Sequence, residues 1–538
     1  MVARHSADPR IVAGIVALAA IALLIGGAFA GLLLEGLRDL SGAVAAFDSY
    51  LGRIVWFTLW QATLSTLLSI VPAIFVARAL SRHPDFPGRA VILRLFALPL
   101  ALPAIVVALG ILALLGRAGY LASPLAALSG GTWQGIYGLS GILVAHVFFN
   151  LPLATRLFLE SLDTLPADQW RLASQLGMRA GSSFRLVEWP ALSAALPGVA
   201  GLVFMLCVTS FTIVLTLGGG PAATTLEVAI YQALRFDFDP ARAVALTFAQ
   251  IALTVAAIWL LTRLGGDPVR DANLGVSPRR YASVAPAERF LNTILILAAA
   301  AFVLGPMVTI TVSGLSADLV RLVNETSIRN AGLTSLMLAS LSAMIAALMS
   351  LALVGARRAL ETGKRGAVRS LLKLAVDTGA GFVLVMPPIV IGAGWFILAL
   401  NSGSVFLIAP FMVVAVNAVM AMPFVVRAVR PAHDAAAERH DRLAASLGIS
   451  GWNRLRLVDW PPIRRPLLTG FAFAMALSLG DLGVIALFGS DTLKTLPFLL
   501  LERMGSYRTA DAAGLALIIA LVCLSLMWVA DHFGKEQG

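Results

Sequence analysis

Apolar residues fall in long runs that are separated by short polar segments. In the first half of the chain the runs lie near 11–34, 54–77, 91–115, 133–155, 191–217 and 243–262. In the second half they lie near 290–312, 331–355, 379–400, 404–426, 466–488 and 512–531. Because about 20 apolar residues of helix cross the hydrocarbon core of a bilayer, each run predicts a transmembrane helix. The predicted fold class is an all-α polytopic membrane protein with about twelve transmembrane helices.

Composition supports this fold class. Of the 538 residues, 59% are hydrophobic and 13% are charged, and the mean hydropathy is +0.89. A soluble protein carries roughly 25% charged residues, so this chain has too few polar side chains to cover a water-exposed surface. Most of the chain is therefore expected to contact lipid.

The positive charge of the chain is distributed by topology. If the N-terminus is cytoplasmic, 30 of the 40 Lys and Arg residues lie in cytoplasmic segments and 10 lie in outer loops. Cytoplasmic loops of membrane proteins carry such an excess. We therefore predict a multi-pass protein whose N- and C-termini are both cytoplasmic. The net charge of +11 is explained in this way, and no nucleic-acid partner is expected.

Two predicted cytoplasmic loops have related sequences. Residues 171–190 read RLASQLGMRAGSSFRLVEWP and residues 442–461 read RLAASLGISGWNRLRLVDWP, with 10 identities in 20 ungapped positions. Six predicted helices separate the two loops, so both lie on the same side of the membrane. The chain is therefore predicted to contain two parallel six-helix repeats, at 1–270 with the loop 156–190 and at 271–538 with the loop 427–465.

Each of these loops has the pattern of a short surface helix. In the first loop Pro166 suits a helix start, Leu172 and Leu176 share one face, and Gly177 suits the left-handed residue that ends a helix. Pro190 can then begin the next transmembrane helix. The same roles in the second loop fall to Pro431, Leu443, Leu447, Gly448 and Pro461. A solvated connector is the alternative interpretation, but the duplication favours a docking site for a partner with two copies.

The loops resemble the signature loop of the membrane subunits of ABC importers. In that family a Glu-Ala-Ala triplet precedes a Gly, and a Pro follows the Gly by thirteen residues; Gly177–Pro190 and Gly448–Pro461 keep that spacing. Ala173 and Ala444 match the second alanine of the triplet, whereas Arg171 and Arg442 replace its Glu. The resemblance implies the type I importer permease fold. It also implies that eight residues couple the chain to an ATPase: Ala173, Leu176, Gly177, Pro190, Ala444, Leu447, Gly448 and Pro461.

Two further stretches narrow the resemblance. Residues 215–243, LTLGGGPAATTLEVAIYQALRFDFDPARA, and residues 478–500, SLGDLGVIALFGSDTLKTLPFLL, are similar to segments of bacterial thiamine and thiamine pyrophosphate importer permeases. Those permeases are also fused double subunits. The resemblance implies import of thiamine and its phosphate esters across the bacterial inner membrane. An iron(III) importer permease is the alternative of the same architecture, and an ion-coupled secondary transporter is a more distant one.

The resemblance also implies the partners. Two copies of a cytoplasmic ABC ATPase would bind the loops and use ATP and Mg²⁺, and a periplasmic substrate-binding protein would deliver the solute. The chain itself has no Gly-x-x-x-x-Gly-Lys-Ser/Thr phosphate loop, since Gly363-Lys364 is followed by Arg365. We therefore predict a transport subunit in the lipid bilayer with no catalytic residue, no metal site and no cofactor of its own.

Polar side chains inside predicted transmembrane helices are candidates for the substrate path. His146 and Asn417 stand at equivalent positions of the two repeats, and Asn150 lies one turn after His146. They can line a pore or form hydrogen bonds between helices of one repeat, and both interpretations remain open.

Asp481 is a carboxylate within an apolar run, and its repeat equivalent is Ser210. A buried anion needs compensation, so Asp481 is expected near the outer vestibule, paired or protonated. An acidic group would favour the cation thiamine. A structural role is the alternative.

Overall fold

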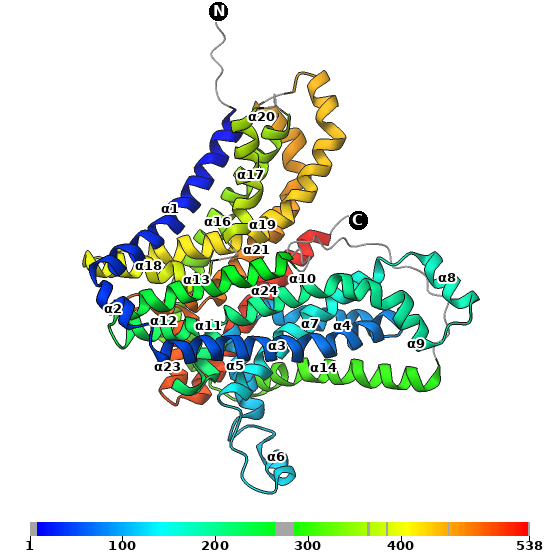
Figure 1. Cartoon of the computed structure of the whole chain (residues 1–538), viewed down its shortest axis with the longest axis horizontal. Helices are drawn as coiled ribbons and strands as arrows, with labels where there is room; N and C mark the ends of the chain where they lie inside the picture. The colour runs from blue at the N-terminus through cyan, green and yellow to red at the C-terminus, as the bar shows by residue number, and fades with distance from the viewer. Residues whose placement is uncertain (1–7, 264–284, 363–365, 384–385, 450, 536–538) are drawn as a thin grey trace, which may run out of the picture. The chain divides into compact units, whose positions relative to one another are not determined.

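The computed structural model describes residues 8–263, 285–362, 366–383, 386–449 and 451–535. In this part of the chain β pairing is limited to one isolated bridge between Ser490 and Leu493. The helices of the first half are α1 (Pro9–Arg38), α2 (Leu40–Ala45), α3 (Ser49–Arg82), α4 (Arg89–Leu95), η1 (Leu98–Ala101), α5 (Ala104–Leu115), α6 (Ala122–Ser129), α7 (Leu139–Asp163), α8 (Ala167–Gln175), α9 (Ala180–Ser183), η2 (Phe184–Glu188), α10 (Trp189–Val208), α11 (Phe211–Leu217), η3 (Pro221–Ala223), α12 (Leu226–Arg235) and α13 (Pro240–Arg263) (Figure 1). Those of the second half are α14 (Pro286–Leu315), α15 (Leu319–Asn324), α16 (Thr326–Thr362), α17 (Ala367–Phe382), α18 (Pro388–Asn401), α19 (Val405–Ser446), α20 (Gly451–Arg454), η5 (Leu455–Asp459), α21 (Trp460–Gly480), α22 (Gly483–Phe488), α23 (Leu496–Gly505) and α24 (Thr509–Lys535).

The helices confirm the predicted fold class. Among the described residues, 10 helices are long and apolar enough to cross a membrane, and a bent pair from α4 to α5 raises the number to 11. The predicted run 379–400 does not form one helix: α17 ends at Phe382 and α18 is an apolar helix of 14 residues. The reason is the pair Pro387-Pro388, since proline has no N–H to donate within a helix and disfavours helical backbone in the preceding residue.

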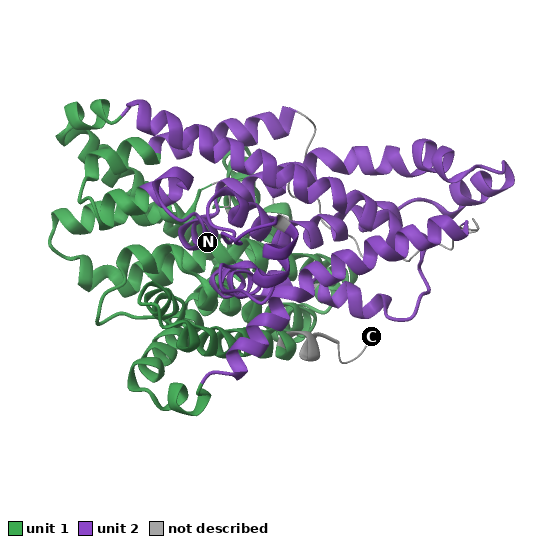
Figure 2. Cartoon of the chain, turned by 90° about the horizontal axis from the view of Figure 1, so that it is seen from below, with its two compact units in different colours: residues 1–46, 230–247, 318–538 green, residues 47–229, 248–317 purple. Residues whose placement is uncertain are grey.

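The described chain packs as two compact units. One unit holds 1–46, 230–247 and 318–538, and the other holds 47–229 and 248–317 (Figure 2). The predicted repeats, 1–270 and 271–538, describe the duplication of the sequence and stay a prediction. The compact units do not coincide with these repeats. The first helix of each half, α1 or α14, belongs to the unit that contains most of the other half.

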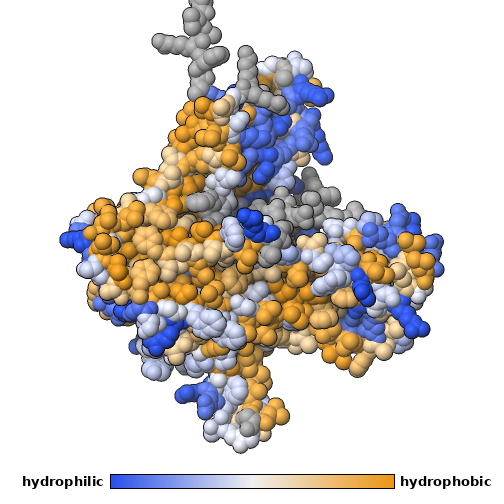
Figure 3. Space-filling view, in the orientation of Figure 1, coloured by the Kyte–Doolittle hydropathy of each residue, from blue (hydrophilic) through white to orange (hydrophobic). Residues whose placement is uncertain are grey.

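Glycine permits the close packing of α1 in its unit. A Cβ atom added at Gly31 would lie 2.3 Å from the carbonyl oxygen of Gly394 in α18, and one at Gly14 would lie 2.2 Å from the Cβ of Ala356 in α16. Small residues let the backbones of membrane helices approach closely and gain van der Waals contact. On the opposite side of α1, Leu23 and Val16 are exposed. Figure 3 shows the apolar side chains that cover this helix, as expected of a surface in contact with lipid.

A glycine also permits close packing of α14 in the other unit. A Cβ atom added at Gly110 of α5 would lie 2.7 Å from the carbonyl oxygen of Pro306 in α14. At this point the hydroxyl of Thr309 donates a hydrogen bond of 3.0 Å to the carbonyl oxygen of Gly110. The first helix of each half is therefore fixed to its unit by glycine contacts, at positions that an added methyl group would block.

Two transmembrane segments are interrupted in both halves. The third bends by 112° between η1 and α5, where Pro103 has extended backbone (φ −59°, ψ 139°), and Pro387 has the same values before α18. The fifth segment breaks at Thr209-Ser210 between α10 and α11, and at Asp481-Leu482 between α21 and α22. Such breaks at matching positions are typical of transporter paths.

Candidate coupling loops and transport path

The first loop forms the predicted short helix. Pro166 precedes α8 as its N-cap, and Gly177 follows it in the left-handed conformation (φ +60°). The N–H of Met178 donates to the carbonyl oxygen of Ala173 at 3.0 Å, and that of Gly177 donates to Ser174 at 3.1 Å. These two bonds make the Schellman motif that ends a helix. The prediction of α8 and of its glycine terminus is confirmed.

The second loop ends in the same way but begins differently. Gly448 has φ +66°, and the N–H of Ile449 donates to the carbonyl oxygen of Ala444 at 2.9 Å. The prediction that Pro431 starts a short helix is wrong, because α19 continues through Pro431 to Ser446. The register of the repeat explains this. Residues 164–166, Thr-Leu-Pro, align with residues 435–437, Ala-Ala-Ala, and alanine is the best helix former.

The outward faces of the two loops match closely. Leu172 and Leu443 are each 56% exposed, and Leu176 and Leu447 are each 64% exposed. Ala173 and Ala444 are buried beneath them. Two leucines one turn apart on a surface helix form an apolar projection that a partner protein can cover.

The interior of each loop is different. In the first loop Trp170 is buried with Ala173 and Val187, and Leu165 and Met178 pack against this cluster. In the second loop Asp441 stands at the position of Trp170. Its carboxylate accepts a hydrogen bond of 2.8 Å from Arg358 and another from Arg454. The same outer surface therefore rests on apolar packing in one copy and on ion pairs in the other.

Each loop ends in a π-helical turn that leads into a transmembrane helix. The turns are η2 and η5, and α10 and α21 follow at Trp189 and Trp460 with Pro190 and Pro461 in their first turns. π-Helical turns are rare and occur frequently at functional sites. The prediction that Pro190 and Pro461 lie at the start of a transmembrane helix is confirmed.

Sequence reasoning missed the buried acid that closes each turn. Glu188 is 1% exposed and Asp459 is 6% exposed, and each directly precedes the Trp-Pro pair. Glu188 contacts Arg78 at 2.7 Å and Arg82 at 2.8 Å, and Asp459 contacts Arg10 at 3.1 Å. The only available signal was the acidic residue shared by VEWP and VDWP.

His146, Asn150 and Asn417 are buried and hydrogen-bonded within their own units. In one unit, α3 and α7 run side by side (Figure 1), and Ser65 Oγ and His146 Nδ1 are hydrogen-bonded at 2.9 Å. The amide of Asn150 donates to Cys207 Sγ at 3.3 Å. In the other unit, the amide of Asn417 donates to Ser478 Oγ at 2.9 Å. These contacts fit the second of the two open interpretations, hydrogen bonding between helices of one repeat.

Ser210 and Asp481 lie at the breaks of the fifth transmembrane segments. Ser210 precedes α11, and its side chain makes no cap bond to that helix. Asp481 precedes α22, and its carboxylate accepts from the N–H of Gly483 at 3.2 Å and of Val484 at 3.4 Å. Asp481 is half-buried, and the two backbone donors supply part of the compensation that its carboxylate needs.

A hydroxyl group caps a ten-residue helix in both halves, α12 and α23, which sequence reasoning also missed. The N–H of Leu226, at the start of α12, donates to Thr58 Oγ1 at 3.1 Å. The N–H of Leu496, at the start of α23, donates to Ser335 Oγ at 2.8 Å. The two hydroxyl groups are 277 residues apart and the two leucines 270, so an ungapped comparison of the halves does not align them.

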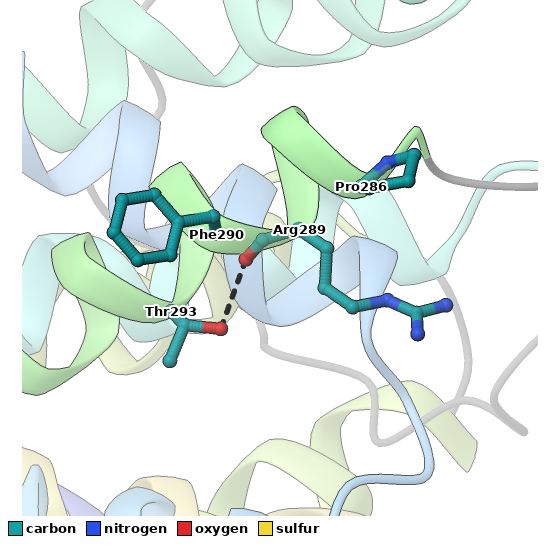
Figure 4. A pocket seen from close by; sticks show the side chains of 4 residues that line it. All are labelled: Pro286, Arg289, Phe290 and Thr293. Atoms are coloured by element: carbon teal, nitrogen blue, oxygen red, sulfur yellow. Dashed lines mark hydrogen bonds between the residues drawn. The ribbon is translucent and has the colours of Figure 1, made fainter.

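A groove at the start of α14 is lined by Pro286, Arg289, Phe290 and Thr293 (Figure 4). The hydroxyl of Thr293 donates to the carbonyl oxygen of Arg289 at 2.9 Å, so it is engaged within its own helix. Phe290 is 70% exposed. Over the described residues, no three His, Cys, Asp or Glu side chains are arranged to hold a metal ion.

Comparison with known proteins decides the family. Residues 65–266 and 362–537 match the binding-protein-dependent transport system inner membrane component family. The chain belongs to this family. The permease is 57% identical over 98% of its length to the thiamine transport system permease protein ThiP of Brucella abortus (strain 2308), of which it covers 96%. It is 42% identical over 90% of its length to the protein of that name from Escherichia coli (strain K12), and it covers 89% of that protein.

Family membership confirms several predictions made from the sequence. The permease is a multi-pass inner membrane component and not an ATPase, and a binding-protein-dependent system supplies it with an ATPase and a binding protein. The two matched segments carry the two loops, which agrees with a fused double permease. A secondary transporter is not consistent with this family.

Proposed function

We propose that this permease imports thiamine. The observation that carries the proposal is the identity of 57% over 98% of the chain with a permease named for thiamine transport. By contrast, a probable sulfate transport permease matches only 21% of the chain at 28% identity. We extend the proposal to the phosphate esters of thiamine. Iron(III) is the alternative solute.

The coupling loops are proposed as the docking sites for two copies of the cytoplasmic ATPase. The equal exposure of Leu172 and Leu443, and of Leu176 and Leu447, supports docking of the same surface of two identical subunits. Gly177 and Gly448 end the helices so that these leucines face outward. Ala173 and Ala444 lie beneath them, and Pro190 and Pro461 start the transmembrane helices that carry the movement.

The orientation follows from this assignment. The loops and the N- and C-termini are placed in the cytoplasm, and a periplasmic binding protein is placed at the outer loops. The excess of Lys and Arg in the proposed cytoplasmic segments supports this topology. ATP and Mg²⁺ belong to the partner ATPase, and no cofactor is assigned to this chain.

The breaks of the fifth transmembrane segments are proposed as the transport path. Ser210 and Asp481 interrupt helices at equivalent positions, and interrupted helices expose backbone polar groups where a solute passes. Asp481 adds a carboxylate that attracts a cation. His146, Asn150 and Asn417 were the other candidates, and their hydrogen bonds between helices support a structural role beside the path.

Reconstitution tests the proposal. The permease is placed in vesicles with its ATPase and binding protein, and ATP hydrolysis and uptake are compared with thiamine, thiamine pyrophosphate and ferric iron. We expect thiamine to stimulate hydrolysis and to accumulate in an ATP-dependent manner. Stimulation by ferric iron alone would assign the alternative solute, and uptake without an ATPase would contradict the proposed mechanism.

A further inference from the structure

Two ion-pair clusters connect the coupling loops to particular helices. We define the Glu188 cluster as Arg78, Arg82, Glu188 and Glu288, and the Asp459 cluster as Arg10, Arg454 and Asp459. In each cluster an acid from the π-helical turn of a loop is buried. The turn lies between the exposed leucines and the first residues of the next transmembrane helix, so movement of the loop passes through it.

The Glu188 cluster contains two acids and two arginines. Arg78 and Arg82 lie one turn apart on α3. Arg82 contacts Glu188 at 2.8 Å and Glu288 at 2.7 Å, and Arg78 contacts the same two acids at 2.7 Å and 3.1 Å. Their side chains are 8% and 17% exposed. Glu288 lies in the first turn of α14, so the arginines connect the first loop to α14.

The Asp459 cluster makes the corresponding connection in the other unit. Asp459 contacts Arg10 at 3.1 Å and Arg454 at 3.7 Å. Arg10 lies in the first turn of α1. Arg454 also bonds to Asp441, which lies beneath the second docking surface. The second loop is thereby connected to α1.

The two connections cross between the sequence halves. The loop of the first half is paired to α14, the first helix of the second half, and the loop of the second half is paired to α1. The contacts lie within one compact unit in each case. Asp459 is 6% exposed and the side chain of Arg82 is 8% exposed. Removal of Arg10 or Glu288 takes from these buried charges one of their two partners, which is costly. Each pair therefore moves with its loop more readily than it separates.

We propose that Glu288 and Arg10 are positioning residues that transmit the movement of each coupling loop to α14 and α1, respectively. The inference rests on the proposed docking of the ATPase. It goes further, because it assigns the conversion of that movement to residues outside the docking surface. Arg10 and Glu288 contact neither the exposed leucines nor Asp441, so a change at either residue leaves docking intact and separates ATP hydrolysis from movement of the permease.

The test follows the movement of each helix with a single reactive cysteine. Leu37→Cys reports at the end of α1 that is far from Arg10, and Ser316→Cys reports at the corresponding end of α14. Both positions are exposed, whereas the two native cysteines are buried. In the reconstituted complex, ATP should change the alkylation rate of each reporter by at least about fivefold, which is the lower end of typical coupling between sites.

Arg10→Gln and Glu288→Gln remove one charge from each cluster. Arg10→Gln should abolish the ATP-dependent change at Leu37→Cys and leave the change at Ser316→Cys, and Glu288→Gln should do the reverse. Both variants should still co-purify with the ATPase and hydrolyse ATP. The matched control is Asp85→Asn, which neutralises an exposed acid near α3 and should leave both reporters unchanged.

A conservative variant distinguishes loss of the ion pair from misfolding. Arg10→Lys keeps a positive charge beside Asp459, and it should retain the response at Leu37→Cys. The inference is overturned if either glutamine variant leaves its own reporter unchanged, if both reporters respond to both variants, or if the ATPase no longer co-purifies. Failure of thiamine uptake by the unaltered complex would instead contradict the proposed solute, because the reporters respond to ATP.

Discussion

Trp170 and Asp441 occupy the same position of the two coupling loops, yet Trp170 is buried in an apolar cluster and Asp441 is bonded to Arg358 and Arg454. The leucines above them are equally exposed. The permease therefore exposes two matching leucine pairs, one resting on apolar packing and the other on ion pairs. Salt screens partly exposed charges but leaves apolar packing almost unchanged, so the two supports can be separated experimentally.

Removal of Trp170 should make docking depend on salt. Trp170→Ala creates a cavity, and such changes cost about 3–5 kcal/mol, so the first loop loses its support. The remaining loop rests on ion pairs whose side chains are 22% and 23% exposed. We expect co-purification of the ATPase with Trp170→Ala to fall when the salt concentration is raised from 0.1 to about 1 M, where the screening length shortens to roughly 3 Å.

Asp441→Ala provides the opposite case. It removes the ion pairs of the second loop and leaves the apolar first loop, so the weakened complex should respond to salt no more than the unaltered one. Equal salt dependence of Trp170→Ala and Asp441→Ala would contradict the assignment of different supports.

Backbone conformation alone should decide which residues can replace the two loop glycines. A Cβ atom added at Gly177 or at Gly448 meets nothing within 4 Å, so space is not limiting. Both residues have positive φ, where a β-branched residue is strained and asparagine is tolerated. We expect Gly177→Val with Gly448→Val to abolish ATPase co-purification, and Gly177→Asn with Gly448→Asn to keep most of it.

Membrane insertion of both double variants should be normal, since the change lies outside the transmembrane helices. Protease accessibility of the loops and the yield of folded protein check this. Equal loss of docking in the valine and asparagine variants would show that side-chain size and not backbone conformation decides the effect.

Local patterns predicted most of the fold. The transmembrane helices follow from apolar runs, and the ends of the coupling helices follow from Gly177 and Gly448, because both signals lie within a few residues. The sequence also contains the signal for the continuity of α19, since Ala435–Ala437 replace the residues that break the helix in the first copy. The prediction of a helix start at Pro431 did not use it.

Long-range contacts left no such signal. Arg10 and Asp459 are 449 residues apart in sequence, and no periodicity connects them. The placement of α1 and α14 depends on single glycines at helix crossings, among 47 glycines in the chain. Polarity alone indicates the candidate path residues, and it cannot distinguish a side chain that lines a path from one that bonds to a neighbouring helix, as His146 and Ser65 do.

His146 should tolerate asparagine better than leucine. The second half already uses an asparagine, Asn417, to bond a serine hydroxyl. His146→Asn retains a polar partner for Ser65, whereas His146→Leu leaves a buried hydroxyl without that partner, which costs roughly 1–3 kcal/mol. Thermal unfolding of the purified permease in detergent should therefore show a lower Tm for His146→Leu than for His146→Asn.

Ser65→Ala in the His146→Leu background supplies the control. Removal of both polar partners should recover part of the lost stability, because no buried hydroxyl remains unpaired. A transport defect of His146→Asn with unchanged Tm would contradict the structural role and return His146 to the path.

Two substitutions separate the negative charge of Asp481 from its hydrogen bonds to the start of α22. Asp481→Asn keeps a side-chain oxygen that can accept from Gly483 and Val484 but removes the charge, whereas Asp481→Ala removes both. If the carboxylate contacts the cationic solute, Asp481→Asn should raise the KM for thiamine uptake about tenfold, since a hydrogen bond to a charged group contributes roughly 1.5–3 kcal/mol. Hydrolysis of ATP and ATPase co-purification should not change.

Ser210→Ala is the matched control at the equivalent break, where the side chain makes no cap bond, and it should leave KM within about twofold. An unchanged KM for Asp481→Asn, with lower thermal stability for Asp481→Ala alone, would make Asp481 a helix cap and would remove it from the path.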